Sequence, residues 1–301
     1  MPDRTIRNTQ PHDYLDLYLA YKENEGKEDV TIRNYRRAVT SFIEATRTPE
    51  DVSELTSDHV VLWLADLRKT GIKDSTLAWY QRHCYPWLTW LYKRGLVAHD
   101  PSKGVERVTV DQTYGRTVTP EVMTRLCTAL ADPRSGVSPE RRTRNMAVIR
   151  TLWSTGLRRA ELAALTYADL DLDYRLPNGK LAARIIVRKA KTDKPRQVPL
   201  DKPAKVAIRE WLIFRGHADG SLFHMSSDAI RTMLQRLATQ AGVKASSHDF
   251  RRGFAAHVRA NGMDIAHTQR LLGHETPTMA MRYSEAGEDE AALRAYYERL
   301  G

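Results

Sequence analysis

The sequence predicts a mainly α-helical protein with one small antiparallel β-sheet. Apolar side chains recur at helical spacing along most of the 301 residues, often after a capping residue. Strand-like patterns occur in one region only, at 170–175, 181–188 and 196–200, where a Pro-Asn-Gly turn separates the first two. A polar stretch near residue 110 interrupts the helical pattern. We therefore expect a helical N-terminal domain followed by an α+β domain.

Four helices are predicted in the first hundred residues. Thr31 is the expected N-cap of the second helix, and Pro86 should kink or split the fourth. The aromatic stripe of the fourth helix, which includes Trp79 and Trp87, favours a hydrophobic core over a surface that stacks on bases. The predicted ranges are 12–22, 31–46, 57–69 and a helix that follows Asp74-Ser75-Thr76.

A linker is predicted at 108–118, because this segment is mostly polar and has no helical apolar periodicity. The expected domains are therefore 1–107 and 119–301. Thr119 and Ser138 are each followed by proline and then glutamate, which is typical of an N-cap with proline at the first helical position. Further helices are expected at 203–214, 227–240, 247–260, 264–272 and 277–284, with an amphipathic docking segment at 286–301.

The positive charge of the chain lies in its second part. The net charge is +10 and the isoelectric point is about 9.6, which favours a polyanionic partner. Residues 1–108 contain 16 basic and 16 acidic side chains, so the whole excess lies in 109–301. A solvated basic surface would explain any single cluster, but this excess coincides with the motifs that suit phosphate chemistry.

Composition and termini favour a protein of the cytoplasm. Cys84 and Cys127 lie far apart and form neither a zinc-ligand spacing nor a disulfide framework. The N-terminus lacks an apolar signal core, and no run of 18 apolar residues occurs. We expect a soluble intracellular protein that does not span a membrane.

His248 and Arg251 are the first candidates for binding an anion. Two serines precede His248, and this capping signal places both side chains on the first turns of one helix, where a backbone N–H can also bind the anion. His267 and Arg270 repeat the His-x-x-Arg spacing, but they lie too close to Gly273 for the same arrangement. We interpret the second pair as surface.

Arg158 and Lys191 are further cationic candidates. Arg158 opens a helix after a Thr-Gly turn, and Glu161, one turn later, is positioned to hold a backbone or cationic group. An ordinary surface ion pair would fit the same spacing. Lys191 lies in the loop between the second and third predicted strands. From this loop an ammonium group could reach a leaving oxygen and donate a proton.

Tyr283 is the candidate nucleophile. It follows the histidine of a Leu-Leu-Gly-His sequence, His274, by nine residues. A phenol can attack a phosphodiester without a metal when arginine and imidazole groups neutralise the phosphate oxygens. Tyr296 and Tyr297 lie on the amphipathic docking segment, so we exclude them as nucleophiles.

Together these residues resemble the tyrosine recombinases, the family of the lambda integrase and the Xer proteins. The resemblance covers most of the chain. Its most specific parts are Thr-Gly-Leu-Arg-x-x-Glu-Leu around Arg158 and Leu-Leu-Gly-His with tyrosine nine residues later. Arg252 departs from the pattern, since many relatives carry a second histidine there. The layout is similar to the compact two-domain Xer or Cre type, and no additional N-terminal domain is expected.

The resemblance implies a site-specific recombinase or integrase that cuts and rejoins DNA through a 3′-phosphotyrosine intermediate and a Holliday junction. Two arginines would bind the non-bridging phosphate oxygens, two histidines would donate hydrogen bonds, and a lysine would protonate the departing 5′-oxygen. No metal or other cofactor is implied, because the arginines take the place of metal ions. The implied residues are Arg158, Lys191, His248, Arg251 and His274, with Tyr283 as nucleophile and Glu161 in support.

The implied partners are double-stranded DNA recombination sites and further copies of the chain. Residues 1–107 resemble the helical core-binding domain of the family. A tetramer on DNA, joined through the C-terminal helix, is expected of a bacterial or phage-encoded protein associated with the nucleoid. Directionality and host factors stay open. Exposed arginines of the N-terminal helices fit either a solvated face or phosphate contacts, and the DNA-binding candidates are Arg33, Arg36, Arg37 and Arg82.

Other functions fit the sequence less well. A type IB topoisomerase or a telomere-resolving strand transferase would use a similar pocket, but the helical N-terminal half and the docking segment favour recombination. A non-catalytic DNA-binding regulator would explain the charge but not Tyr283 and its partners. A metal-dependent nuclease would need clustered carboxylates, whereas the acidic residues near the first strand read as a helix end and a strand edge: Asp169, Asp171 and Asp173.

Overall fold

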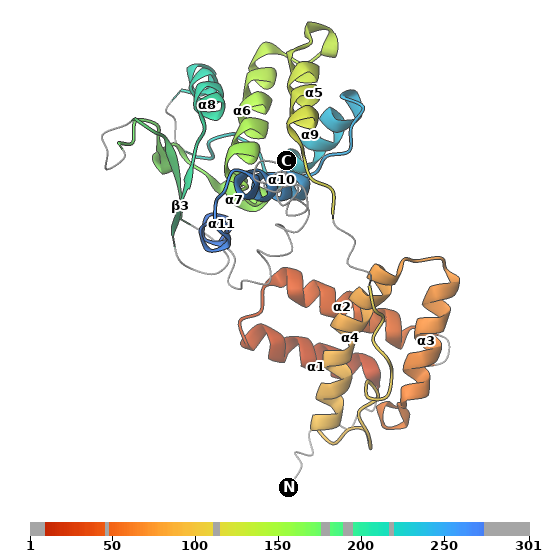
Figure 1. Ribbon diagram of the computed structural model, residues 1–301. Coiled ribbons are helices and arrows are strands. Elements are labelled where there is room, and N and C mark those ends of the chain that lie inside the picture. The colour runs from red at the N-terminus through yellow and green to blue at the C-terminus, as the bar shows by residue number, and fades with distance from the viewer. Residues whose placement is uncertain are drawn as a thin grey trace, which may run out of the picture. The chain divides into compact units, whose positions relative to one another are not determined.

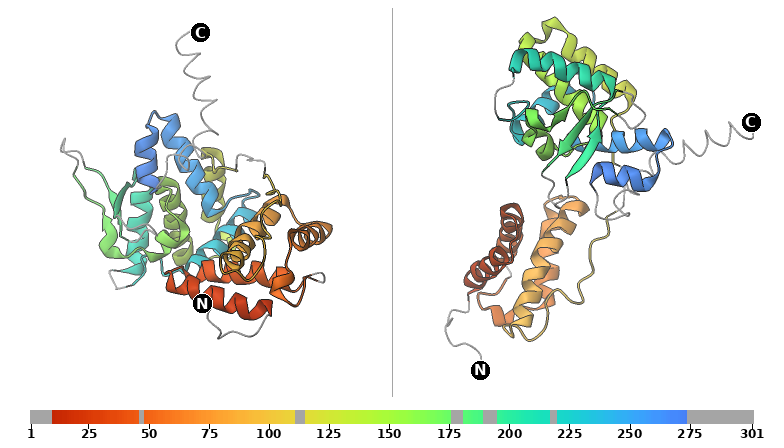
Figure 2. Two further views of the ribbon diagram at one scale, coloured as in Figure 1. Left: turned by 90° about the horizontal axis from the view of Figure 1, so that it is seen from below. Right: turned by 90° about the vertical axis from the view of Figure 1, so that its left-hand side faces the viewer.

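The protein consists of two compact units, residues 1–112 and 113–301, each with its own hydrophobic core (Figures 1 and 2). The mainly helical fold with one small antiparallel sheet, predicted from the sequence, is confirmed. No helix among the described residues is both long and apolar enough to cross a membrane. The computed structural model describes residues 10–45, 48–110, 115–175, 181–188, 195–216 and 220–273.

The first unit is built from four α-helices around an aromatic core. Phe42 and Trp87 are fully buried, and the ring of Phe42 lies 5.3 Å from that of Trp63 and 6.3 Å from that of Trp87, in edge-to-face geometry. The predicted core role of the aromatic stripe is thus confirmed for Trp87. The helices are α1 (Pro11–Asn24), α2 (Asp29–Ile43), α3 (Ser57–Lys69) and α4 (Asp74–Lys93), with a short 3₁₀ turn at Val52–Glu54.

For these helices one predicted N-cap is wrong, and of the two outcomes expected at Pro86, a kink or a split, the split is excluded. α2 begins two residues before Thr31, with Glu28 as its N-cap, and the carbonyl of Glu28 accepts the Thr31 N–H. Pro86 does not split α4, which is continuous from Asp74 to Lys93. Tyr85 and Trp87, on either side of the proline, are buried in the core. The burial of these large side chains outweighs the one backbone hydrogen bond that proline removes.

Both described ends of the predicted linker are hydrogen-bonded, each to its own unit. The buried side chain of Gln81 accepts the N–H of Val108 through Oε1 (2.8 Å) and donates through Nε2 to the carbonyl of Glu106 (2.9 Å). In the second unit, the N–H of Val118 donates to the carbonyl of Asp249 (2.9 Å). The first and last residues of the expected linker at 108–118, Val108 and Val118, are therefore each held by a hydrogen bond to their own unit.

The second unit packs helices around one central helix, α6. α6 contacts α5, α8, α10 and the third strand of the sheet (Figure 1). Its start at Ser138 and that of α5 at Thr119 are confirmed, since each hydroxyl accepts a backbone N–H three residues later. The helices are α5 (Pro120–Ala131), α6 (Pro139–Thr155), α7 (Arg159–Ala164), α8 (Lys202–Arg215), α9 (Ser227–Gln240), α10 (Ser247–Ala260) and α11 (Ile265–Leu272), with 3₁₀ turns at Pro133–Ser135 and Tyr167–Asp169.

The sheet is antiparallel, with strand order β1-β2-β3 (Figure 2). Ile185 pairs with Val198, and both side chains are buried in the core of this unit. The same inward face of β3 also carries Arg196, a position at which the period of two would normally place an apolar side chain. The strands are β1 (Leu170–Asp171), β2 (Arg184–Val187) and β3 (Arg196–Pro199).

Candidate active site

The turn that ends α6 delivers Arg158 to the site. Gly156 has a φ of +61°, and a Cβ built there would lie only 2.6 Å from the ring of Phe254, so only glycine fits. The hydroxyl of Thr155 accepts the N–H of Leu157 (3.3 Å), which is itself buried. Arg158 therefore leaves a rigid turn as the N-cap of α7.

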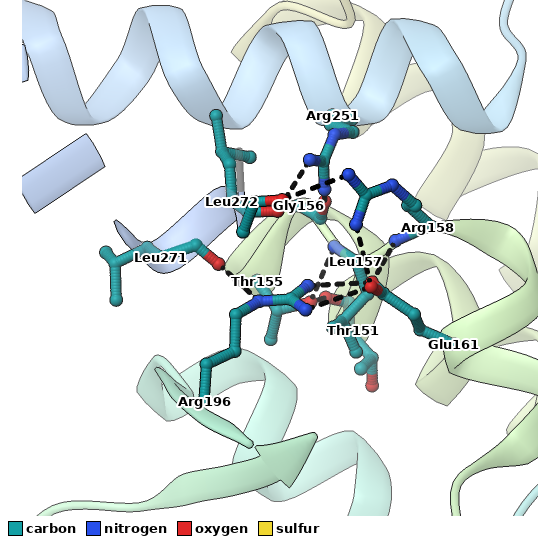
Figure 3. Close-up of polar contacts among 11 residues, drawn as sticks. Thr151, Thr155, Gly156, Leu157, Arg158, Glu161, Arg196, Arg251, Leu271 and Leu272 are labelled. Carbon is teal, nitrogen blue, oxygen red and sulfur yellow. Dashed lines mark hydrogen bonds and ion pairs between the residues drawn. The ribbon is translucent and has the colours of Figure 1, made fainter. Parts of the chain in front are cut away.

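Glu161 is a buried carboxylate that binds two guanidinium groups. It is 6 % exposed; Oε2 accepts the backbone N–H of Arg158 (2.8 Å) and Oε1 accepts its Nη1 (3.0 Å). Arg196 donates Nη1 to Oε1 (2.9 Å) and Nη2 to Oε2 (2.7 Å), as Figure 3 shows. Burial alone would raise the pKa of Glu161, but the hydrogen bonds and charge of Arg196, together with Arg158, lower it. Glu161 is therefore ionised at neutral pH.

Arg196 is the functional candidate that the sequence analysis missed. Besides its fork on Glu161, its Nε donates to the carbonyl of Leu271 (2.8 Å). A usable signal exists in the sequence, because the alternation of β3 places Arg196 on the inward face with Val198 and Leu200. An arginine on the buried face of a strand needs a buried anionic partner.

Three arginines bind the last turn of α11. Arg251, which is 2 % exposed, donates Nη2 to the carbonyl of Leu272 (2.6 Å) and Nη1 to that of Gly156 (2.8 Å). Arg158 donates Nη2 to the carbonyl of Gly273 (3.1 Å). Figure 3 shows the guanidinium groups converging on this turn from α10, α7 and β3. The last carbonyls of a helix lack intrahelical donors and carry partial negative charge, which suits cations.

His248 lies at the start of α10, beside these arginines. Ser246 caps the helix and Asp249 completes the capping box, which confirms the predicted helix start. His248 is exposed, but partial loss of water around the ring and the positive charges of Arg252 and Arg251 lower its pKa below the ordinary value of 6.5. The imidazole is therefore neutral at neutral pH and is able to accept a proton.

Arg252, the residue that departs from the expected pattern, forms an ion pair with Asp249. Its Nη1 lies 3.2 Å from Oδ1 of Asp249, the buried capping carboxylate of α10. Arg116 also approaches Asp249, at 3.9 Å. The guanidinium of Arg252 thus stays close enough to His248 to repel a proton from the imidazole.

Several predicted site residues lie outside the described part of the chain. These are Lys191, His274, Tyr283 and the docking segment at 286–301, together with the predicted helix at 277–284. Their proposed roles stay predictions. His274 is covalently bonded to Gly273, whose carbonyl accepts from Arg158. The described residues therefore hold the chain at the point where the predicted nucleophile segment begins.

His267 and the three acidic residues near β1 each contact a side-chain partner. His267 is exposed and pairs with Asp264 in the first turn of α11, which confirms its interpretation as surface. Within the described ranges, no group of three or more His, Cys, Asp or Glu side chains could hold a metal ion. The three acidic residues near β1 each bind a different arginine, Asp169 with Arg188 (2.6 Å), Asp171 with Arg184 (3.0 Å) and Asp173 with Arg209 (2.8 Å).

The arginines predicted to contact DNA are exposed in the first unit. Arg36 pairs with Asp16 (2.8 Å), and the guanidinium of Arg37 lies 5.4 Å from the ring centre of Trp79. Arg33 is exposed on the same helix, α2. Arg82, on α4, lines a cavity of about 490 Å³ together with three other cations, Lys22, Lys93 and Arg107.

Comparison with known proteins assigns both units. Residues 116–290 match the model of the phage integrase family, and residues 15–95 match its N-terminal SAM-like domain. Tyrosine recombinase XerC of Xanthomonas axonopodis pv. citri (strain 306) is 25 % identical over 285 residues, covering 86 % of this chain and 88 % of the relative. Tyrosine recombinase XerA of Thermococcus kodakarensis is 27 % identical over 286 residues, with 92 % of each chain covered.

Solved structures share the fold. The XerH recombinase in a post-cleavage complex with its palindromic difH substrate has a TM-score of 0.77 at 17 % identity, covering 98 % of this chain and 99 % of that chain. A lambda integrase dimer bound to a COC′ core site has a TM-score of 0.72 at 16 % identity, covering 91 % and 77 %. Because the integrase model spans more than half of the sequence, this chain belongs to the phage integrase family and is a tyrosine recombinase, an enzyme that breaks and rejoins DNA strands.

Proposed function

We propose that the chain is a site-specific recombinase in which Tyr283 attacks a DNA phosphate and Arg158 and Arg251 stabilise the charge that develops. The observation that carries this proposal is the convergence of both guanidinium groups on the last turn of α11, immediately before His274. The cations are fixed by the protein, so little reorganisation is needed when a phosphate binds.

The proposed first step transfers the phosphoryl group from DNA to the protein. The phenol of Tyr283 loses its proton to the neutral imidazole of His248, and the phenolate oxygen bonds to phosphorus. The bond from phosphorus to the 5′-oxygen breaks, and Lys191 gives that oxygen a proton. His274 donates a hydrogen bond to the phosphate. The product is a 3′-phosphotyrosine ester and a free 5′-hydroxyl, and reversal on a partner strand passes through a Holliday junction.

Glu161 has a supporting part in this proposal. It fixes Arg158 from behind, while 36 % of the arginine side chain stays exposed. A guanidinium that is held on one side and open on the other can bind phosphate oxygens in a fixed orientation. Arg251 starts from a more buried position and reaches the site from α10.

The comparisons support double-stranded DNA as the partner, since the XerH and lambda integrase structures are of DNA complexes. We further propose that 1–107 contacts DNA through Arg33, Arg36, Arg37 and Arg82, that 119–301 carries out the reaction, and that the two flank a linker. Action on the nucleoid in the cytoplasm fits this partner. A type IB topoisomerase or telomere resolvase is less well supported, because the matched relatives are recombinases.

Replacing the nucleophile should separate binding from chemistry. We expect Tyr283→Phe to bind DNA normally but to form no covalent adduct, because the ring loses only its hydroxyl. A nicked suicide substrate and a denaturing gel measure the adduct. Tyr296→Phe is the matched control and should form the adduct at the wild-type level. An adduct formed by Tyr283→Phe would show that another residue attacks.

Arg158→Lys should be nearly as damaging as Arg158→Ala. An ammonium group is a point charge that cannot make a planar two-point contact with a phosphate while it is held by Glu161, so we expect cleavage to slow by about 10²–10³-fold. The single-turnover rate on the suicide substrate measures this loss. Arg184→Lys, in an ion pair on β2, is the control and should cleave normally. Near-wild-type cleavage by Arg158→Lys would rule out the forked contact.

Assembly is expected to depend on the C-terminal segment. We propose a tetramer on DNA joined through 286–301, whose Leu293, Tyr296, Tyr297 and Leu300 follow helical spacing. Deleting 286–301 should weaken pairing of two DNA sites while binding to one site is kept. Sedimentation of the protein–DNA complexes measures both. Unchanged tetramer formation by the truncated protein would disprove this docking role.

The positive charge of Arg252 is expected to lower the pKa of His248, the proposed proton acceptor. Arg252→Ala should raise the pKa of His248 towards its ordinary value, because one of the nearby positive charges is removed while burial remains. NMR titration of the imidazole in the DNA-free protein measures the midpoint. Arg184→Ala should leave it unchanged. A midpoint that does not rise in Arg252→Ala would mean that this charge does not act on His248.

A further inference from the structure

We infer that Arg196 is a positioning residue for strand cleavage: it fastens the last turn of α11, and hence the start of the segment that carries His274, to the carboxylate that also holds Arg158. This inference rests on the proposed function, but it concerns a residue to which the recombinase chemistry itself assigns no part. Arg196 is hydrogen-bonded to Glu161 and to the carbonyl of Leu271, and we propose that it acts through these two groups.

The geometry of Arg196 uses all three nitrogens of one guanidinium. Nη1 and Nη2 form a two-point contact with Glu161 at 2.9 and 2.7 Å, and Nε donates to the carbonyl of Leu271 at 2.8 Å. Figure 3 shows this bridge between β3, α7 and α11. Arg196 is only 9 % exposed, so water does not compete freely for these contacts. Charge-assisted two-point contacts of this kind are strong and directional.

Gly273 provides a second, independent observation. Its φ is +66°, and a Cβ built at this position would lie 3.0 Å from Nη1 of Arg196 and 3.1 Å from Cζ. The glycine therefore gives both the left-handed backbone that ends α11 and the space in which the guanidinium of Arg196 packs. A side chain at position 273 would therefore crowd the guanidinium of Arg196.

Loss of Arg196 should disturb two parts of the site together. Of its two arginine partners Glu161 would keep only Arg158. The position of the Arg158 guanidinium on the carboxylate would therefore change. The carbonyl of Leu271 would lose its donor, and the last turn of α11 would be free to shift. Displacements of about 1 Å at a reacting group cost on the order of 10²-fold in rate. DNA affinity should change little, because Arg196 is buried and phosphate contacts on the surface dominate binding.

The test compares Arg196→Met with Arg184→Met in the full-length protein. Both variants remove an arginine ion pair from the same sheet, but Arg184 pairs with Asp171 and does not contact Glu161 or α11. Thermal melting, affinity for a nicked suicide substrate and the single-turnover cleavage rate at saturating DNA are measured for each. We expect cleavage by Arg196→Met to slow by about 100-fold with affinity nearly unchanged, whereas Arg184→Met cleaves normally.

A double-mutant cycle identifies the path of the effect. If Arg196 acts in part through Glu161, then Glu161→Gln should slow cleavage, and the rate loss of the double variant with Arg196→Met should be smaller than the product of the two single losses. A role limited to overall stability would weaken DNA binding as well as slow cleavage, and its effects would multiply with those of Glu161→Gln. Multiplying rate losses would therefore overturn the inference.

Two further outcomes keep the inference separate from the proposed function. If wild-type protein forms no adduct on DNA, the proposed function is wrong, and the positioning role of Arg196 is wrong with it. If wild type cleaves and Arg196→Met cleaves equally fast, only the positioning role is wrong. Should Arg196→Met not fold, Arg196→Lys decides, because lysine keeps a cation beside Glu161 but cannot also reach Leu271. Wild-type cleavage by Arg196→Lys would overturn the inference.

Discussion

The site depends on one buried carboxylate, that of Glu161. Arg158 and Arg196 both bind it, and without its charge the two guanidinium groups would repel each other in a region with little water. Removing one partner from a buried ion pair typically costs about 3–5 kcal/mol, because the remaining charge is left unpaired. The same carboxylate accepts the backbone N–H of Arg158, the N-cap of α7, so the start of the helix and the position of the arginine are set together.

The second constraint is the end of α11. Three consecutive carbonyls there each accept from a different arginine: Leu271 from Arg196, Leu272 from Arg251 and Gly273 from Arg158. The protein thus supplies oxygen acceptors to its cations before any DNA binds. Guanidinium groups that folding has already oriented need little rearrangement to stabilise charge on a phosphate. The same contacts fix the point from which the chain continues to the predicted nucleophile.

Arg252 gives the site an electrostatic character of its own. This chain places a permanent positive charge beside His248, and Asp249 holds the guanidinium of Arg252 there. The charge keeps the imidazole neutral to lower pH, which favours a role as proton acceptor over one as proton donor. In our proposal, hydrogen bonds to the phosphate are then donated mainly by the arginines and His274.

Local features of the sequence determined the elements and the family. Capping residues such as Thr119 and Ser138 fixed where helices start, because an N-cap contact involves residues only three positions apart. Motifs around Arg158 and His274 were sufficient to indicate a tyrosine recombinase. The tertiary structure alone decided that Pro86 lies inside an unbroken helix, since the burial of its neighbours has no local signature. It alone also joined Arg196 to Leu271, 75 positions away, because such a contact depends on how a strand and a helix pack and not on any spacing along the chain.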